Sequence, residues 1–417
     1  DMQANRSKSS GSGTALLSLT REQILSFRLK SHNLTGISPS DITDAFGGWV
    51  MQNSPPGAWE LSVFSRMPDI TLSSLDEALT ESRTLIQAWS LRGAPCIFPV
   101  QDCDVFLTAL IPENEPWIYT RGIALVLEHL HMSMEELLPL VKNAALILNE
   151  NEIVGKPSLD HILAEETAKS LDRVKKGLWY SPSFFSPEQT MGEAAVSFLL
   201  RPCSLEKLVV FGKREKNLPT FTSLRSWCPS VFGPDRRVPS PTAVLVKRFL
   251  HSYGPASPAM LADTLGCSPG QAKRMWKDAE RIYPIIPVRS GNKTAFILEE
   301  DLPSFMAPDS SLTDCDMSVG ILSPHDPYLD IHDRELLLPD KQLQKQVWKT
   351  VGNPGVILRR GMIAGTWRSA RKNGSLSAEF SLWFTPSASH KEIMERWFEG
   401  YAKLYDLKQK ELKINIM

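Results

Sequence analysis

A pair of side-chain amides stands out among the residues that could do chemistry. Gln52 and Asn53 directly precede Ser54-Pro55-Pro56, in a stretch rich in tryptophan and glycine. Such amides can hold a water molecule or contact the edge of a nucleic-acid base. They can also hydrogen-bond the backbone of a turn ahead of a helix that starts near Pro56. The chemistry of these residues alone favours the second interpretation, and both stay open at this point.

The densest polar cluster in the chain runs from His325 to Arg334 and contains two histidines and three aspartates. These side chains could bind a metal, but Pro327 interrupts the helix that would align them. We therefore favour a structured turn that organises the entrance of a C-terminal domain, and we expect no metal and no other cofactor. The sequence has no Gly-rich phosphate loop, GxSxG motif or HExxH motif, which argues against nucleotide hydrolysis, hydrolase triads and zinc peptidases.

The elements that must position these side chains belong to a chain of 417 residues with a formal net charge of -1. This length predicts two to four domains. Its apolar runs are too short to span a bilayer, so we expect no membrane-spanning segment. Six cysteines without CxxC spacing argue against a zinc finger or a disulfide scaffold. They favour a reducing compartment, and we expect a cytoplasmic protein.

The clearest structural unit follows Pro239. Three helices are predicted over Thr242–Ser252, Pro258–Leu265 and Pro269–Arg281, followed by strands over Ile285–Arg289 and Thr294–Leu298. Helix, helix, helix and hairpin in this order is the winged-helix arrangement, in which the hairpin forms the wing.

The end of the same pattern occurs earlier in the chain, with a helix over Gly192–Arg201 and strands over Leu208–Phe211 and Thr220–Leu224. Short helices ahead of residues 87–99 indicate a third copy. After Leu302 the pattern changes to a linker over Pro303–Thr313, several strands and a final helix over Lys391–Leu412. We therefore predict an α+β protein with tandem winged-helix domains and a small C-terminal β-barrel-like domain with a terminal helix.

The predicted domain organisation has five parts. A disordered lead-in covers residues 1–17, and an N-terminal winged-helix-like domain covers residues 18–112. A second winged-helix domain spans residues 113–232 and a third spans residues 233–302. The linker and the C-terminal β-rich domain occupy residues 303–417.

Charge is segregated along the chain although it sums to almost zero. Residues 299–340 contain eleven acidic side chains and one basic one, whereas residues 341–417 contain fourteen basic and six acidic ones. Basic side chains on wing tips, on a recognition helix and on exposed strands are what backbone phosphates require. Any single one of them is more simply explained as a solvated surface residue. The residues expected to contact double-stranded DNA are Lys213, Arg214, Lys216, Lys273, Arg274, Lys277, Arg289, Lys293, Arg359, Arg360, Arg368, Arg371 and Lys372.

The chain resembles the AlkZ/YcaQ-like winged-helix DNA glycosylases. The matching stretches extend nearly end to end and include residues 25–29, 52–56, 88–95 and 253–257. The more specific stretches are His325-Asp326-Pro327-Tyr328 with Asp333-Arg334, and Gly361-Met362-Ile363-Ala364-Gly365-Thr366-Trp367-Arg368.

This resemblance implies excision of alkylated or cross-linked bases without a metal, by polar groups that hold a water and stabilise a positively charged sugar. Characterised members of the family carry a Gln-x-Gln or Gln-x-Asp motif, and the matching positions here are Val50-Met51-Gln52. Gln52 therefore corresponds to the second polar position, while Val50 replaces the first glutamine. The implied catalytic residues are Gln52 with Asn53 or Asp326 assisting.

Two further functions compete with the glycosylase. The first is a non-catalytic DNA-binding protein, such as a regulator or lesion binder, that kept the scaffold and lost the site. The second is a protein-interaction module with no role on nucleic acid. For the glycosylase and for the non-catalytic DNA-binding protein, we expect a monomer that binds double-stranded DNA.

Overall fold

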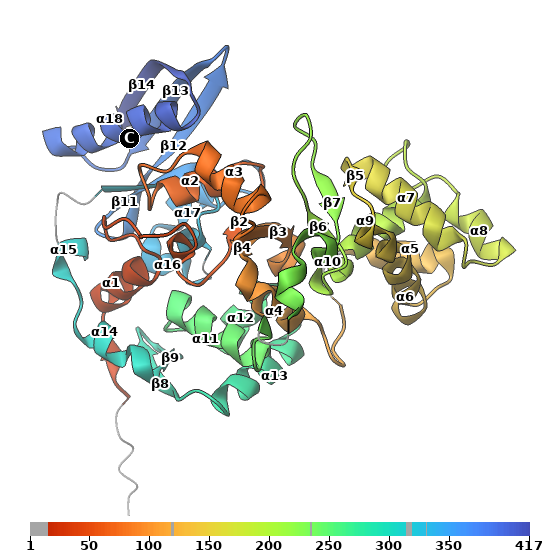
Figure 1. Ribbon diagram of the computed structural model, residues 1–417. Helices are drawn as coiled ribbons and strands as arrows, with labels where there is room; N and C mark the ends of the chain where they lie inside the picture. Colours follow the sequence, from red (N-terminus) through yellow and green to blue (C-terminus); the bar gives the residue numbers. More distant parts are fainter. Residues whose placement is uncertain (1–15, 118–120, 234–235, 314–318, 331) are drawn as a thin grey trace, which may run out of the picture.

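The computed structural model describes residues 16–117, 121–233, 236–313, 319–330 and 332–417. The described residues have the mixed α+β class that the sequence predicts, with three sheets and many helices. Figure 1 shows a central body from which a helical lobe and a C-terminal sheet project in different directions. Most of the lead-in expected over residues 1–17 lies outside the described residues.

The elements of the described residues are mostly short. The helices are α1 Arg21–Ser31, α2 Ala58–Phe64, α3 Leu72–Thr80, α4 Cys103–Phe106, α5 Arg121–Leu130, α6 Met134–Ala145, α7 Lys156–Ala168, α8 Arg173–Trp179, α9 Met191–Leu205, α10 Leu224–Trp227, α11 Pro241–Tyr253, α12 Pro258–Leu265, α13 Pro269–Glu280, α14 Leu302–Met306, α15 Ser310–Thr313, α16 Arg334–Leu337, α17 Lys341–Val347 and α18 Ala388–Leu404. The strands are β1 Ser18–Leu19, β2 Met51–Gln52, β3 Leu85–Trp89, β4 Pro95–Pro99, β5 Ile153–Val154, β6 Val210–Phe211, β7 Thr220–Thr222, β8 Ile285–Ser290, β9 Lys293–Leu298, β10 Val319–Leu322, β11 Gly355–Arg359, β12 Met362–Lys372, β13 Ser375–Leu382 and β14 Lys408–Ile416.

A six-stranded sheet joins the first half of the chain, in the order β2-β4-β3-β6-β7-β5. Its two halves meet where Gln87 of β3 pairs with Phe211 of β6. Across this junction the Trp89 ring stacks on Phe221, with centroids 5.5 Å apart. The sheet therefore runs continuously across the domain boundary expected after residue 112.

The helical lobe of α5 to α9 covers one end of this sheet (Figure 1). Its helices begin at side-chain caps: the Ser133 and Thr190 hydroxyls each accept a hydrogen bond from the backbone three residues on, and the glutamates there bond back. These reciprocal bonds satisfy N–H groups that the first turn leaves free. Trp179 is fully buried in the lobe, and it packs so closely on Gly192 that a Cβ there would lie 2.2 Å from its indole nitrogen.

The unit after Pro239 contains the predicted order of helices and hairpin, with α11, α12 and α13 followed by β8 and β9. A third strand that the sequence analysis did not predict, β1, pairs in parallel with β8. The expected linker over Pro303–Thr313 is wrong, because this stretch contains most of α14 and all of α15. Its Phe305 is fully buried and stacks on Phe27 of α1 at 3.9 Å, so apolar packing holds the segment against the body.

The C-terminal sheet has the order β10-β11-β12-β13-β14. Both of its hairpin turns place two consecutive residues at positive φ, at Arg360-Gly361 and at Asn373-Gly374, as the turn residues predict. The final helix expected over Lys391–Leu412 is wrong in its second half. α18 ends at Leu404, Asp406 adopts φ 50°, and Lys408–Ile416 forms β14 parallel to β13. The alternation of Leu412, Ile414 and Ile416 suits a strand, and α18 provides the long connection that parallel strands need.

Candidate active site

Gln52 is the last residue of β2, at one edge of the six-stranded sheet. The strand pairs with β4, where Gln52 lies opposite Cys96. Val50 and Met51 are buried in the core, whereas the Gln52 side chain is half-buried and faces a cavity. Its Nε2 donates to the Ser54 carbonyl oxygen at 3.3 Å. The amide oxygen of Gln52 thus remains available to the cavity while the nitrogen steadies the side chain.

Both amide atoms of the neighbouring Asn53 side chain form hydrogen bonds within the protein. Its Oδ1 accepts a hydrogen bond from the Gly57 backbone N–H at 2.7 Å, and its Nδ2 donates to Gln87 Oε1 at 3.1 Å. The residue is 7% exposed and does not line the cavity. The interpretation that the chemistry favoured, an amide that stabilises a turn before a helix, therefore holds for Asn53. It holds in part for Gln52, whose Nε2 bonds the Ser54 carbonyl oxygen but whose side chain also lines the cavity.

Asp326 lies inside the protein at 0% exposure. Its two carboxylate oxygens accept hydrogen bonds from Arg66 at 2.8 and 3.0 Å, and one also accepts the Tyr328 backbone N–H at 3.0 Å. Arg66 reaches it from the end of α2 and also donates to the His32 and Ser62 carbonyl oxygens. Asp326 thus ties the C-terminal segment to the N-terminal helices and does not contact the cavity that Gln52 faces.

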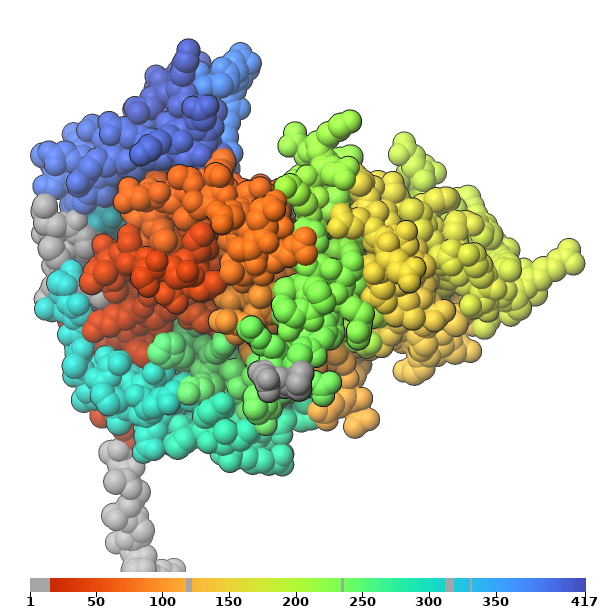
Figure 2. Space-filling view, viewed as in Figure 1, coloured from red at the N-terminus to blue at the C-terminus, as the bar shows by residue number. Residues whose placement is uncertain are grey.

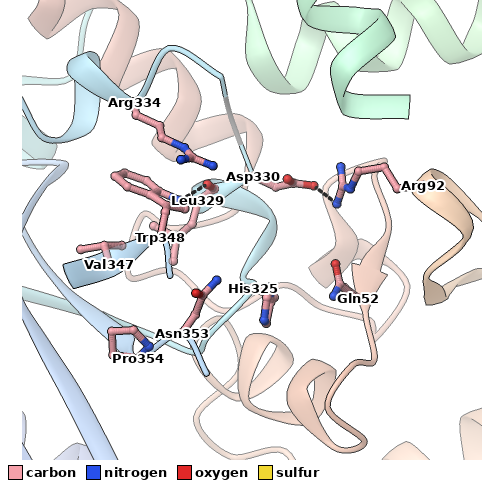
Figure 3. A pocket seen from close by; sticks show the side chains of 10 residues that line it. All are labelled: Gln52, Arg92, His325, Leu329, Asp330, Arg334, Val347, Trp348, Asn353 and Pro354. Atoms are coloured by element: carbon pink, nitrogen blue, oxygen red, sulfur yellow. Dashed lines mark hydrogen bonds and ion pairs between the residues drawn. The ribbon is translucent and has the colours of Figure 1, made fainter. Parts of the chain in front are cut away.

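The cavity in front of Gln52 has a volume of about 280 Å³ and is lined by side chains from widely separated parts of the chain. Figure 3 shows these side chains converging from the Gln52 strand on one side and the C-terminal region on the other. The lining residues are Gln52, Arg92, His325, Leu329, Asp330, Arg334, Val347, Trp348, Asn353 and Pro354. Of the three catalytic residues predicted from the sequence, only Gln52 is among them.

An ion pair spans the wall of this cavity beside Gln52 (Figure 3). Arg92 Nη2 lies 2.7 Å from Asp330 Oδ2, and both side chains are 31% exposed. Arg92 Nη1 also donates to the Thr264 carbonyl oxygen at 2.7 Å, which anchors the guanidinium at the end of α12. The wall thus presents a fixed carboxylate to the same space as the Gln52 amide.

Two residues that line the cavity adopt a left-handed backbone conformation that residues other than glycine rarely take. Arg92 has φ 55° and His325 has φ 62°. Such strain persists only where the surroundings impose it, and it concentrates at functional sites. Burial lowers the pKa of His325 below its usual 6.5, so its imidazole is neutral at pH 7 and can donate one hydrogen bond and accept another.

A second hollow of about 230 Å³ adjoins the first and shares Asn353 and Pro354 with it. Pro55, Pro56 and Gly57 line one side of this hollow, after the Gln52 strand. The hollow is also lined by four polar side chains of β12 and α18, namely Arg368, Ser369, Arg371 and Tyr401. The second hollow therefore shares part of its wall with the cavity of the catalytic candidate and is lined by basic residues of the C-terminal sheet.

The other predicted phosphate contacts are spread over the molecule. Lys213, Arg214 and Lys216 occupy the β6–β7 loop, which flanks a notch opposite the C-terminal sheet in Figure 2. The residues of α13, β8 and β9, namely Lys273, Arg274, Lys277, Arg289 and Lys293, lie toward the other end of the molecule in Figure 1.

Several of these basic side chains already have partners within the protein. Arg274 Nε lies 2.6 Å from Glu115, and Lys213 Nζ lies 2.9 Å from Glu81. The Arg359 guanidinium covers the Phe384 ring at 5.0 Å, and that of Arg371 lies 3.5 Å above Tyr405. Arg368, Arg371 and Lys372 share β12, and Arg368 and Arg371 line the second hollow. Arg360 lies at the turn before β12, at the opposite end of the strand from Lys372.

Four residues that line the cavity were not predicted as site residues from the sequence, namely Arg92, Asp330, Trp348 and Asn353. Asp330 belonged to the polar cluster that was noted as a possible metal site, but local sequence could not distinguish it from Asp326 or Asp333. Within residues that the structure describes, no three His, Cys, Asp or Glu side chains gather in a way that could hold a metal ion. In that same part of the chain, no helix is both long and apolar enough to cross a membrane.

Comparisons with known proteins agree with this architecture. A family model described as "DNA glycosylase AlkZ-like" matches residues 49–403. The fold is similar to that of the Streptomyces sahachiroi DNA glycosylase AlkZ, with a TM-score of 0.74 and 16% identity over 96% of this chain and 100% of that one. A search of curated proteins finds no match.

Proposed function

Because the chain belongs to the AlkZ-like DNA glycosylase family, we propose that it hydrolyses the N-glycosidic bond of alkylated or cross-linked bases in double-stranded DNA. The observation that carries this proposal is the position of Gln52, whose amide faces a polar cavity. This cavity shares Asn353 and Pro354 with the second hollow, where Arg368 and Arg371 of β12 lie. An amide with only a structural role needs no such cavity. The chemistry is that of side chains and water, as the family resemblance implies.

The reaction needs little more than orientation and charge stabilisation. A cationic alkylpurine leaves readily, taking the electron pair of the bond to C1′ and becoming neutral. The sugar is left with positive charge, which polar groups aimed at C1′ stabilise. The Gln52 oxygen would accept a hydrogen bond from the attacking water and hold it beneath the sugar.

The proposal also covers the domain architecture and the residues that contact DNA. The order of α11, α12, α13 and the β8–β9 hairpin supports a winged-helix unit, and the C-terminal sheet with α18 supports a small barrel-like domain. DNA would lie along the second hollow beside β12, within reach of Arg368, Arg371 and Lys372, with Arg360 at the opposite end of the strand. We further propose that the protein acts as a monomer in the cytoplasm.

A non-catalytic DNA-binding protein remains the alternative because of one specific observation. Val50 occupies the first polar position of the family motif and is 6% exposed, packed into the core. β2 therefore supplies one polar group to the cavity where the family pattern has two. This alternative predicts salt-sensitive DNA binding without base release.

Release of free base from alkylated duplex DNA by the purified protein tests the proposal. Gln52→Ala should lower the single-turnover rate by at least about tenfold, the loss expected for a group that contacts the reacting water. The matched control is Gln101→Ala, the same truncation at an exposed position away from the cavity. Unchanged release by Gln52→Ala would remove Gln52 from the site, and no release by the wild-type protein would favour the DNA-binding alternative.

A further inference from the structure

Asp330 places a carboxylate in the cavity that Gln52 faces. In this cavity β2 provides one polar group where the family motif has two. We propose that Asp330 is a catalytic residue of this site, acting together with Gln52 and taking the role that Val50 cannot fill. The inference rests on the proposed glycosylase function and deepens it. The two proposed catalytic residues then come from different parts of the chain, Gln52 from the N-terminal sheet and Asp330 from the C-terminal segment.

The geometry leaves one oxygen of Asp330 for substrate. Oδ2 is held by Arg92 at 2.7 Å, whereas Oδ1 accepts no hydrogen bond from the described residues. The main chain is fixed as well, since the Asp330 N–H donates to the Pro327 carbonyl oxygen at 3.1 Å. A carboxylate held through one oxygen, with the other facing a polar cavity, is arranged to act on a bound molecule.

Two residues near Asp330 have a strained backbone conformation. Arg92, its partner, has a left-handed backbone and packs so tightly on Gly266 that a Cβ there would lie 2.9 Å from the Arg92 Cα. His325, on the same wall, is also left-handed. A merely structural ion pair at this exposure contributes little to stability, which does not explain two strained residues around it.

The chemistry suits a carboxylate in two ways. As the bond from C1′ to the base nitrogen breaks, its electron pair leaves with the base, and the negative Asp330 stabilises the positive sugar that remains. Water held by Gln52 then forms the new C1′–O bond, and its proton passes to Asp330 Oδ1 and on to solvent. A cationic base is released neutral, one water is consumed and one proton is produced, so atoms and charge balance.

Single-turnover release of N3-methyladenine and N7-methylguanine from methylated duplex DNA tests the inference. Asp330→Asn should lower the rate by about 100-fold or more, in the range of a lost general base. Asp330→Glu should keep activity within about tenfold of wild type, because it retains the carboxylate. Glu335→Gln, an exposed carboxylate five residues along the chain, is the matched control and should stay within about twofold.

Two measurements separate catalysis from a structural role. The dependence of the release rate on pH should differ between wild type and Asp330→Asn, because only the wild type carries the carboxylate. Added formate should restore release by a folded Asp330→Ala variant several-fold, and this variant also decides the matter if Asp330→Asn does not fold. Binding of the duplex should not weaken in either variant, since each removes a negative charge.

The outcomes distinguish this inference from the function on which it rests. If wild type releases base and Asp330→Asn matches it while Gln52→Ala does not, the role of Asp330 is overturned and the glycosylase stands. Loss of activity without rescue by formate and without a changed pH profile also overturns it, because that pattern indicates a structural ion pair. If wild type releases no base, both proposals fail together.

Discussion

The buried pair of Arg66 and Asp326 gives the sharpest prediction about how this fold is held together. Arg66 and Asp326 have side chains that are 1% and 0% exposed. Replacing Arg66 by methionine keeps much of the side-chain volume but leaves a buried carboxylate without its counter-charge. Removing one partner of a buried ion pair lowers the free energy of unfolding by about 3–5 kcal/mol. The His32 and Ser62 carbonyl oxygens also lose their hydrogen-bond donor, which lowers the stability further.

For a chain of this length unfolding as one unit, that change lowers the melting temperature by about 3–6 °C. Thermal unfolding followed by circular dichroism measures it. Asp326→Asn should have a similar effect, since it leaves Arg66 charged and buried. The control is Arg281→Met, which breaks an exposed pair with Asp278 and should cost no more than about 1 kcal/mol.

A double-mutant cycle completes the test. Arg66→Met with Asp326→Leu should be less destabilised than the sum of the single variants, because the second substitution removes the charge that the first one strands. Additive losses, or a melting temperature for Arg66→Met equal to that of the Arg281→Met control, would refute the reasoning. A stable Asp326→Asn variant that merely lost base release would return Asp326 to the catalytic residues predicted from sequence.

Two further predictions concern pH and DNA. Burial lowers the pKa of His32 from 6.5 to about 3, so below pH 6.5 the unfolded chain binds a proton that the folded protein does not. The folded protein therefore loses stability as the pH falls below 6.5, by at most about 1.4 kcal/mol per pH unit. This pH dependence should disappear in His32→Gln and persist in the exposed control His131→Asn. The stability gap between wild type and His32→Gln, measured by urea unfolding, should therefore change between pH 6.5 and 4, and a constant gap would contradict it. On DNA, Arg368→Ala should reduce the slope of log affinity against log salt by about 0.9, whereas Arg173→Ala, on the distant α8, should leave it unchanged. Equal slopes for both would remove Arg368 from the interface.

Much of the local structure could be predicted because its causes are local. The capping box at Thr20, the turns at Gly361 and at Asn373-Gly374, and the order of helices and hairpin after Pro239 all follow from neighbouring residues. The mistakes occurred where a distant partner decides. Residues 408–416 form a strand because β13 is there to pair with, and residues 303–313 are held in place by α1.

The candidate site divides in the same way. The sequence by itself determined that Gln52 and Asn53 form an amide pair before a proline turn, and that His325–Arg334 concentrates polar groups. It could not determine which amide faces a cavity, or which aspartate is buried against Arg66 and which one meets Arg92. Those choices depend on segments more than 200 residues apart in the chain, and side-chain burial and ion pairing are set only when tertiary packing brings them together.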